Sequence, residues 1–154
     1  NSSGRFIAFH DSDDTWKKNK LKIQIRYMKK NNVSFSHTNY QIVNESNKKI
    51  GKMQIKKYLS YKDLLKSCDI GLSTVMIEKK LLKNNLFPNL KTKEDYALWL
   101  KLAKKGIVIK GILFFTINEW LTLSKKNGHV APKWVSANNK IVKIINVVSK
   151  LGKQ

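Results

Sequence analysis

Two short clusters of carboxylates are the side chains in this sequence that are most able to do chemistry. The chain of 154 residues carries 31 basic and 10 acidic side chains, and half of the acidic ones fall in two places. The clusters are Asp11, Asp13 and Asp14, and then Glu94 and Asp95. Clustered carboxylates repel one another, but they become favourable when a cation binds between them or when one acts as a base.

The first cluster has the spacing of a site for a hard cation. Alternate residues of an extended segment point the same way, so Asp11 and Asp13 could hold one Mg²⁺ or Mn²⁺ ion. Such ions prefer oxygen ligands and often bridge protein carboxylates to substrate phosphates. An EF-hand is excluded, because Trp16 and Lys22 stand where that loop requires glycine and glutamate. The alternative is a polar turn in which Asp14 caps a helix.

The second cluster lies at the start of a predicted helix, residues 94–105. The helix dipole favours negative charge in a first turn, so capping alone would explain Glu94 and Asp95. What favours chemistry is that both clusters belong to one domain. The sequence therefore predicts that the clusters share a site.

The elements that must position these clusters alternate between strand and helix. A buried strand at 5–10 runs directly into Asp11, and open α/β sheets place their ligands beyond strand ends of this kind. The further predicted elements are a helix at about 15–30, a strand at 33–43, a loop or hairpin at 44–57, a short helix at 61–68, a strand at 70–77, a short helix at 78–84, the helix at 94–105, and strands at 107–109 and 112–117 with Gly111 as a break. This alternation predicts an α/β fold.

Composition limits the classes of protein that the chain can belong to. The net charge of +21 attracts polyanions, although a solvated, lysine-rich surface explains it equally well. Cys68 is the single cysteine, which excludes an internal disulfide and a cysteine-based zinc site. No apolar run reaches the roughly 18 residues of a membrane span, and the first residues do not read as a secretion signal. A cytoplasmic location is therefore the default expectation.

Several segments together resemble bacterial family 2 glycosyltransferases, which have the GT-A fold. Residues 4–16 are similar to the GRYIAFLDSDD-x-W segment of that family. The further segments that agree in order and spacing are Lys20, Leu21, Gln24 and Met28 of the following helix, residues 35–40, residues 64–75, Phe87–Pro88 and residues 94–100. The resemblance covers about residues 4–120.

The resemblance implies roles for individual residues. Asp11 and Asp13 match the DXD motif, which binds Mn²⁺ or Mg²⁺ on the diphosphate of the donor, and the adjacent Asp14 would assist. Asp95 matches the general base of inverting members. Glu94 would orient the loop or bind the acceptor.

Trp99 has two readings. The resemblance suggests that it lines the acceptor pocket, whereas its helical spacing with Tyr96, Leu100 and Ala103 is typical of a core residue.

The implied activity is that of a hexosyltransferase. It would transfer a sugar from a nucleotide-diphosphate sugar to a saccharide or lipid-linked acceptor, in the synthesis of cell-surface polysaccharide or lipopolysaccharide. Residues 1–123 would be the C-terminal, metal- and acceptor-binding part of a GT-A domain. Family members begin with a strand, a turn and a helix that hold the nucleoside. We therefore expect a GT-A sheet truncated at its N-terminus, and this puts the activity of the chain alone in doubt.

Two alternatives remain open at this point. A basic nucleic-acid-binding module without catalysis would use the charge and the aromatic side chains, but the aromatics fall mostly at core-like positions. Residues 124–154 read as a basic loop and an amphipathic helical tail over about 134–151. That helix would either lie on an anionic membrane, which would place an enzyme at its inner face, or pack on the domain.

Overall fold

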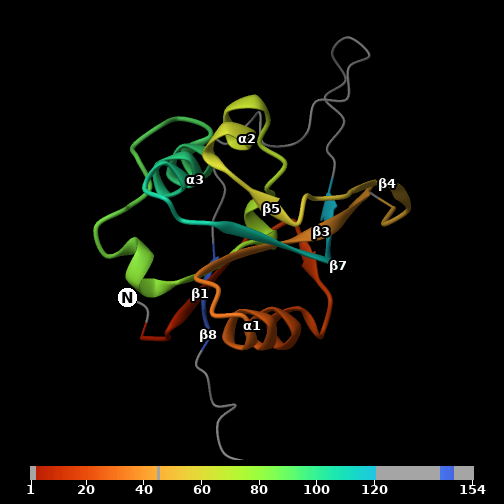
Figure 1. The fold of residues 1–154 in the computed structure, drawn as a ribbon. Coiled ribbons are helices and arrows are strands. Elements are labelled where there is room, and N and C mark those ends of the chain that lie inside the picture. Colours follow the sequence, from red (N-terminus) through yellow and green to blue (C-terminus); the bar gives the residue numbers. More distant parts are fainter. Residues whose placement is uncertain (1–2, 45, 121–142, 148–154) are drawn as a thin grey trace, which may run out of the picture.

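A single mixed sheet with helices on both faces forms the centre of the molecule (Figure 1). The computed structural model describes residues 3–44, 46–120 and 143–147, and it describes side chains as far as residue 114. The strands are β1 (Phe6–His10), β2 (Thr15–Trp16), β3 (Phe35–Val43), β4 (Lys49–Met53), β5 (Tyr58–Leu59), β6 (Met76–Glu78), β7 (Ile109–Trp120) and β8 (Lys143–Val147). The helices are α1 (Lys20–Lys30), α2 (Tyr61–Lys66) and α3 (Glu94–Lys104), with 3₁₀ turns η1 (Leu72–Thr74) and η2 (Lys79–Leu82).

The order and direction of the strands place the carboxyl ends of β1, β3 and β7 on the same side of the sheet. In the described residues the order is β2-β7-β3-β6-β1-β8, with β4 paired to β3 and β5 to β7. β6 is antiparallel to both β1 and β3, and β7 is parallel to β3. β1, β3 and β7 therefore run in the same direction. Asp11, which follows β1, lies at the edge where ligands of α/β sheets usually bind.

Alternation along β1 supplies apolar side chains to two cores, one on each face of the sheet. Ile7 and Phe9 belong to the core beneath α3, whereas Phe6 and Ala8 belong to the core beneath α1. Because both faces are covered, β1 is a continuous apolar run, as the sequence predicted.

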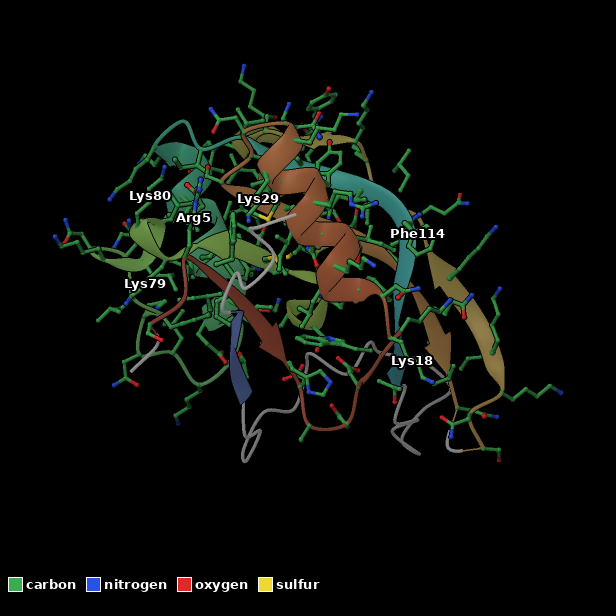
Figure 2. The ribbon with its side chains drawn as sticks, turned by 90° about the horizontal axis from the view of Figure 1, so that it is seen from below. Arg5, Lys18, Lys29, Lys79, Lys80 and Phe114 are labelled. Atoms are coloured by element: carbon green, nitrogen blue, oxygen red, sulfur yellow. The ribbon has the colours of Figure 1, made fainter. Side chains whose placement is uncertain are left out.

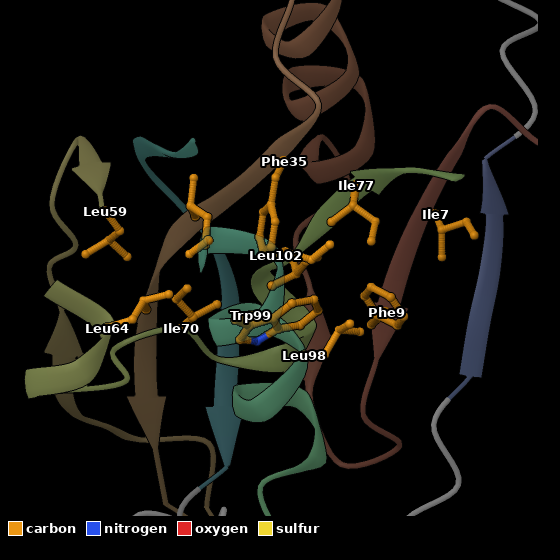
Figure 3. Close-up of a cluster of buried hydrophobic side chains, with 13 residues drawn as sticks. Ile7, Phe9, Phe35, Leu59, Leu64, Ile70, Ile77, Leu98, Trp99 and Leu102 are labelled. Carbon is orange, nitrogen blue, oxygen red and sulfur yellow. The ribbon is translucent and has the colours of Figure 1, made fainter. Parts of the chain in front are cut away.

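The larger core lies between the sheet and the layer formed by α2 and α3 (Figure 3). Trp99 is at its centre and is completely buried. Its ring makes edge-to-face contacts with Phe9, Phe35 and Phe87, at centroid distances of 5.8, 4.9 and 6.1 Å. These contacts fix α3 against β1 and β3, and so they set where the first turn of α3 lies.

Basic side chains cover the face that carries α1 (Figure 2). Lys18 and Lys29 are exposed there, as are Lys79 and Lys80. Lys20 differs from all of them, because only 1% of it is exposed. Most of the charge is thus on a solvated surface, and the buried lysine requires a separate explanation.

The first helix begins later than predicted. Thr15 and Trp16 form β2 and pair with Asn118 and Ile117 of β7, so neither Asp14 nor Thr15 caps a helix. α1 starts at Lys20 after Asn19, whose side chain makes no capping hydrogen bond. Hydrogen bonding to a distant strand has overridden the local helical preference.

Two predicted strands also differ in extent. Residues 70–77 contain the η1 turn and only their end joins the sheet as part of β6. Residue 109 and the segment 112–117 belong instead to one strand, β7, in which Gly111 is an interior residue, whereas residues 107 and 108 precede that strand. A Cβ atom at Gly111 would lie 2.1 Å from the backbone oxygen of Lys56, so glycine here permits close approach rather than a break.

The tail helix predicted over 134–151 is wrong for the part that the structure describes. Lys143–Val147 form β8 and pair antiparallel with β1. β1 offers unpaired backbone groups along its outer edge, and β-branched residues favour an extended partner there. The rest of that predicted helix and the basic loop at 124–133 lie outside the described residues.

Candidate active site

The three aspartates of the first cluster meet in a tight turn after β1. The backbone nitrogen of Asp14 donates to the backbone oxygen of Asp11 at 3.1 Å, which closes the turn. Carboxylate oxygens of Asp11, Asp13 and Asp14 lie within 4.8 Å of one another. Asp11 is buried, with 8% of its surface exposed, and the other two are half-buried. We refer to residues 11–14 as the acidic turn.

The donor set of the acidic turn fits a hard divalent cation. Mg²⁺ binds oxygen at about 2.0–2.1 Å in an octahedral shell, so its ligand oxygens lie roughly 3–4 Å apart. Small rotations of three carboxylates that are already within 4.8 Å of one another would reach that spacing. The set contains only oxygen ligands, which suits Mg²⁺ or Mn²⁺ rather than zinc.

Ser73 holds the acidic turn in place through two hydrogen bonds. Its hydroxyl oxygen accepts a hydrogen bond from the backbone nitrogen of Asp11 at 2.8 Å. Its backbone oxygen accepts a hydrogen bond from Nε1 of Trp16 at 3.0 Å. One buried residue of η1 therefore anchors the turn where it leaves β1 and again where it enters β2.

Asp95 lies in the first turn of α3, and local hydrogen bonds fix its position. Lys93 precedes the helix in a left-handed conformation, with φ of 61°, and so ends the preceding loop. One carboxylate oxygen of Asp95 accepts a hydrogen bond from the backbone nitrogen of Tyr96 at 2.7 Å. The hydroxyl of Tyr96 in turn donates to the backbone oxygen of Leu64, which ties α3 to α2.

The surroundings of Asp95 favour its protonated form. Burial raises the pKa of Asp95, and the hydrogen bond from the Tyr96 nitrogen opposes this shift. The negative charges of Glu94 and Asp11 raise the pKa of Asp95 further. Because Asp11 acts on Asp95, the acidic turn and the start of α3 are close enough to interact electrostatically. A carboxylate with a raised pKa is suited to accept a proton near neutral pH.

The thiol of Cys68 lies near Asp95 but is not suited to covalent catalysis. Burial raises the pKa of Cys68 to about 11, and the negative charge of Asp95 contributes to the shift. A thiol with so high a pKa is protonated at neutral pH and is therefore a poor nucleophile.

The remaining residues that the sequence singled out differ in how deeply they are buried. Glu94 is half-buried beside Asp95 in the first turn of α3. Trp99 has no exposed surface, so its burial supports the core role and not the role in an acceptor pocket. The rings of His10 and Trp16 pack edge-to-face at a centroid distance of 4.6 Å.

Ser73, which contacts the acidic turn, received no role from the sequence. Neither did Lys20 and Gln24, which are hydrogen bonded to each other, with Gln24 also bonded to η1. Lys20 and Gln24 did carry a signal, because they are four residues apart in a segment that resembles the family. Ser73 carried none beyond its place in the resembling stretch 64–75.

The carboxylates identify this site, and a hollow on the protein surface does not. One hollow among the described residues, of about 480 Å³, follows the exposed side of α1. Lys22, Arg26 and Lys30 line it, together with Ile23 and Tyr27, and the acidic turn does not. The carboxylate geometry is the better guide, since it is the feature with chemical meaning.

The sheet, its flanking helices and the acidic turn after β1 define a mixed α/β domain of the GT-A type. Residues 1–90 match the family described as Glycosyl transferase family 2, and the chain belongs to this family.

Named relatives agree with this family. A UDP-Glc:alpha-D-GlcNAc-diphosphoundecaprenol beta-1,3-glucosyltransferase of Escherichia coli, WfgD, is 50% identical over 103 residues, which cover 67% of this chain and 40% of that protein. A second enzyme of the same description from Escherichia coli, WfaP, is 43% identical over 107 residues, covering 69% of this chain and 41% of that protein. The putative teichuronic acid biosynthesis glycosyltransferase TuaG of Bacillus subtilis is 38% identical over 112 residues, covering 72% and 44%. The chain thus spans about two fifths of the length of these relatives.

Two further observations concern nucleic-acid binding and membrane insertion. Tyr40 and Trp99 are buried and Trp16 is half-buried, so these aromatics are poorly placed to stack on the bases of a nucleic acid. Every helix among the described residues is too short or too polar to cross a bilayer.

Proposed function

We propose that this chain carries the metal-binding and acceptor-activating part of a glycosyltransferase. The enzyme would transfer a hexose from a nucleotide-diphosphate sugar to a saccharide or lipid-linked acceptor. The observation that carries the proposal is the gathering of three carboxylates in the acidic turn of a family 2 fold. Asp95, whose pKa is raised by burial and in part by the charge of Asp11, supplies a further carboxylate suited to accept a proton.

In this proposal Asp11 and Asp13 bind Mn²⁺ or Mg²⁺, and Asp14 assists. The fit of three carboxylates within 4.8 Å supports this assignment. When bound, the cation would neutralise negative charge on the departing nucleoside diphosphate. The backbone contact from Asp11 to Ser73 keeps the turn in place while that charge develops.

Asp95 acts as the general base in an inverting transfer. Its carboxylate takes the proton from the acceptor hydroxyl as that oxygen attacks the anomeric carbon of the donor. Proton transfer of this kind typically contributes about 10²–10⁴-fold in rate. The hydrogen bond from the Tyr96 nitrogen holds one carboxylate oxygen of Asp95 and so orients the carboxylate for this step. Glu94 keeps the pKa of Asp95 raised and contacts the acceptor.

The acceptor is a sugar linked through a diphosphate to a lipid, as the names of the two Escherichia coli relatives describe for those enzymes. An acceptor of this kind is held in a membrane. The proposal therefore places the reaction at the inner face of the membrane, in the assembly of a cell-surface polysaccharide. The basic surface around α1 is compatible with an anionic surface nearby.

A direct test measures Mn²⁺-dependent release of sugar from a panel of nucleotide sugars, with and without a diphosphate-linked acceptor. Asp13→Asn should lose activity by removing a cation ligand, and Asp95→Asn should lose it by removing the base. Asp63→Asn is the matched control, because Asp63 is an aspartate outside both acidic clusters, where it completes the capping box of α2 with Ser60. If Asp13→Asn and Asp95→Asn both match the parent, the assigned roles are wrong.

A further inference from the structure

The buried ammonium group of Lys20 lies behind the acidic turn. Its Nζ donates to Oε1 of Gln24 at 2.8 Å and lies 4.4 Å from the centroid of the Trp16 ring. Among the described residues Lys20 forms no ion pair, so no carboxylate compensates its burial. Burying an uncompensated charge costs free energy, and a lysine kept in such a place calls for a reason beyond packing.

Gln24 explains why a donor is required at position 20. The Nε2 group of Gln24 donates to the backbone oxygen of Thr74 at 2.8 Å and to Oγ of Ser36 at 3.1 Å. The amide nitrogen is therefore committed to η1 and β3, which leaves Oε1 facing α1. Since Gln24 is completely buried, that oxygen needs a donor from the protein, and Lys20 supplies it.

Trp16 connects this pair to the acidic turn. One face of its indole ring receives the Lys20 ammonium, a contact that strengthens when both groups are removed from water. Its Nε1 donates to the backbone oxygen of Ser73, whose hydroxyl accepts from the backbone nitrogen of Asp11. A continuous series of contacts thus runs from Lys20 through Trp16 and Ser73 to the first aspartate.

We infer that Lys20 is a positioning residue for the acidic turn. It holds Trp16 against η1 and orients Gln24, and through these contacts it keeps the carboxylates of Asp11 and Asp13 at the spacing that a divalent cation requires. The inference rests on the proposed function, because it takes the acidic turn to be a cation site. It adds a role for a residue that touches neither cation nor substrate.

The test compares Lys20→Met with Lys22→Met. Methionine keeps most of the length of the lysine side chain and removes the ammonium, and Lys22 is an exposed lysine on the same helix. Affinity for Mn²⁺ alone is measured by electron paramagnetic resonance titration of the full chain, and folding is followed by thermal melting. Lys20→Met should bind Mn²⁺ at least about 10-fold more weakly, and its melting temperature should fall because Oε1 of Gln24 loses its donor, so all proteins are titrated well below their melting temperatures. Lys22→Met should match the parent.

A second measurement needs neither bound metal nor activity. The chain is labelled with 5-fluorotryptophan, and the Trp16 resonance is assigned from its loss in Trp16→Phe. Lys20→Met should shift or broaden that resonance, whereas Lys22→Met should leave it in place. His10 also touches the ring, so the comparison is repeated in a His10→Gln background.

The two measurements separate the failure of this inference from failure of the proposed function. If the parent binds no Mn²⁺, the cation site in the proposed function is wrong, and the fluorine resonance alone decides the role of Lys20. If the parent binds Mn²⁺ and Lys20→Met binds it equally well, the inference is overturned. It is also overturned if the Trp16 resonance of Lys20→Met matches that of the parent.

Discussion

The negative charge of Asp11 raises the pKa of Asp95, although one residue follows β1 and the other begins α3. The contacts of Trp99 with Phe9 and Phe35 produce this relationship, because they fix α3 over the sheet. Two clusters that repel each other in the absence of a cation are thereby brought together. A cation bound at the acidic turn would relieve that repulsion, which couples cation binding to the protonation of the base.

The first prediction concerns the protonation of Asp95. Asp11→Asn should lower the pKa of Asp95, because it removes a negative charge that favours the protonated form. The measurement is a ¹³C titration of the labelled aspartate carboxyl groups without divalent cations. Glu94→Gln should shift the pKa of Asp95 in the same direction. Asp63→Asn is the control, and an equal shift in that variant would mean that the effect is not specific.

The second prediction follows from the burial of Lys20. Desolvation lowers the pKa of Lys20 to about 7 from its ordinary value of 10.5. Between these values the unfolded chain binds a proton that the folded chain does not, so the free energy of unfolding should rise with pH from about 7 to 10.5. The slope from this one group approaches about 1.4 kcal/mol per pH unit. Urea unfolding at several pH values should show that difference between the parent and Lys20→Met, and parallel curves would contradict it.

The third prediction concerns His37, which is completely buried in β3. Neither ring nitrogen has a hydrogen-bond partner in the part of the chain that the structure describes. Burial lowers the pKa of His37 to about 3, so the folded chain keeps a neutral ring while the unfolded chain takes up a proton below about pH 6.5. The parent should therefore lose stability as the pH falls from about 6.5 towards 3.

The matched variant for this third prediction is His37→Leu, which has a similar volume and no polar atoms. It should be more stable than the parent by about 1–3 kcal/mol, since unsatisfied buried polar groups are removed. The difference should widen as the pH falls from 6 to 4. A variant that is less stable at every pH would show that His37 has a hydrogen-bonding role.

The fourth prediction tests the close approach of β7 to the chain near β5. A Cβ atom at Gly111 would lie 2.1 Å from the backbone oxygen of Lys56, so Gly111→Ala forces the backbone to move. Overpacking of this kind typically costs about 1–3 kcal/mol. Gly51→Ala is the control, because a Cβ atom there meets Ile42 at an ordinary 3.4 Å. Equal free energies of unfolding for the two variants would contradict the register of β7.

The sequence correctly predicted the strands and helices that are determined by the spacing of neighbouring apolar residues. The apolar run of β1 and the helical spacing of α3 both gave the correct element within one residue at each end. Gly106 has φ of +82° just after α3, a left-handed conformation that favours glycine where a helix ends. These features depend on neighbours in the chain, and so the sequence is sufficient to find them.

Features that depend on distant partners were missed. Thr15 and Trp16 form a strand only because β7 lies beside them, and the η1 turn forms where Ser73 meets the acidic turn. The sequence predicted that the two acidic clusters share a site, and this stays a prediction, but nothing in the sequence indicated the residues that hold them. A lysine in a lysine-rich helix gives no sign that it is the buried one, since burial depends on how α1 packs on Trp16.

The central claim is that Asp95 and the acidic turn form one site around a divalent cation. The most direct measurement adds Mn²⁺ to a chain labelled with ¹³C in the carboxyl groups of aspartate and glutamate, with Mg²⁺ as the diamagnetic reference. The signals of Asp11, Asp13 and Asp95 should broaden together at substoichiometric Mn²⁺. The signal of Glu78 should remain sharp, because Glu78 pairs with Phe6 at the opposite end of β1. If the Asp95 signal stays as sharp as that of Glu78 while Asp11 broadens, the two clusters do not form one site.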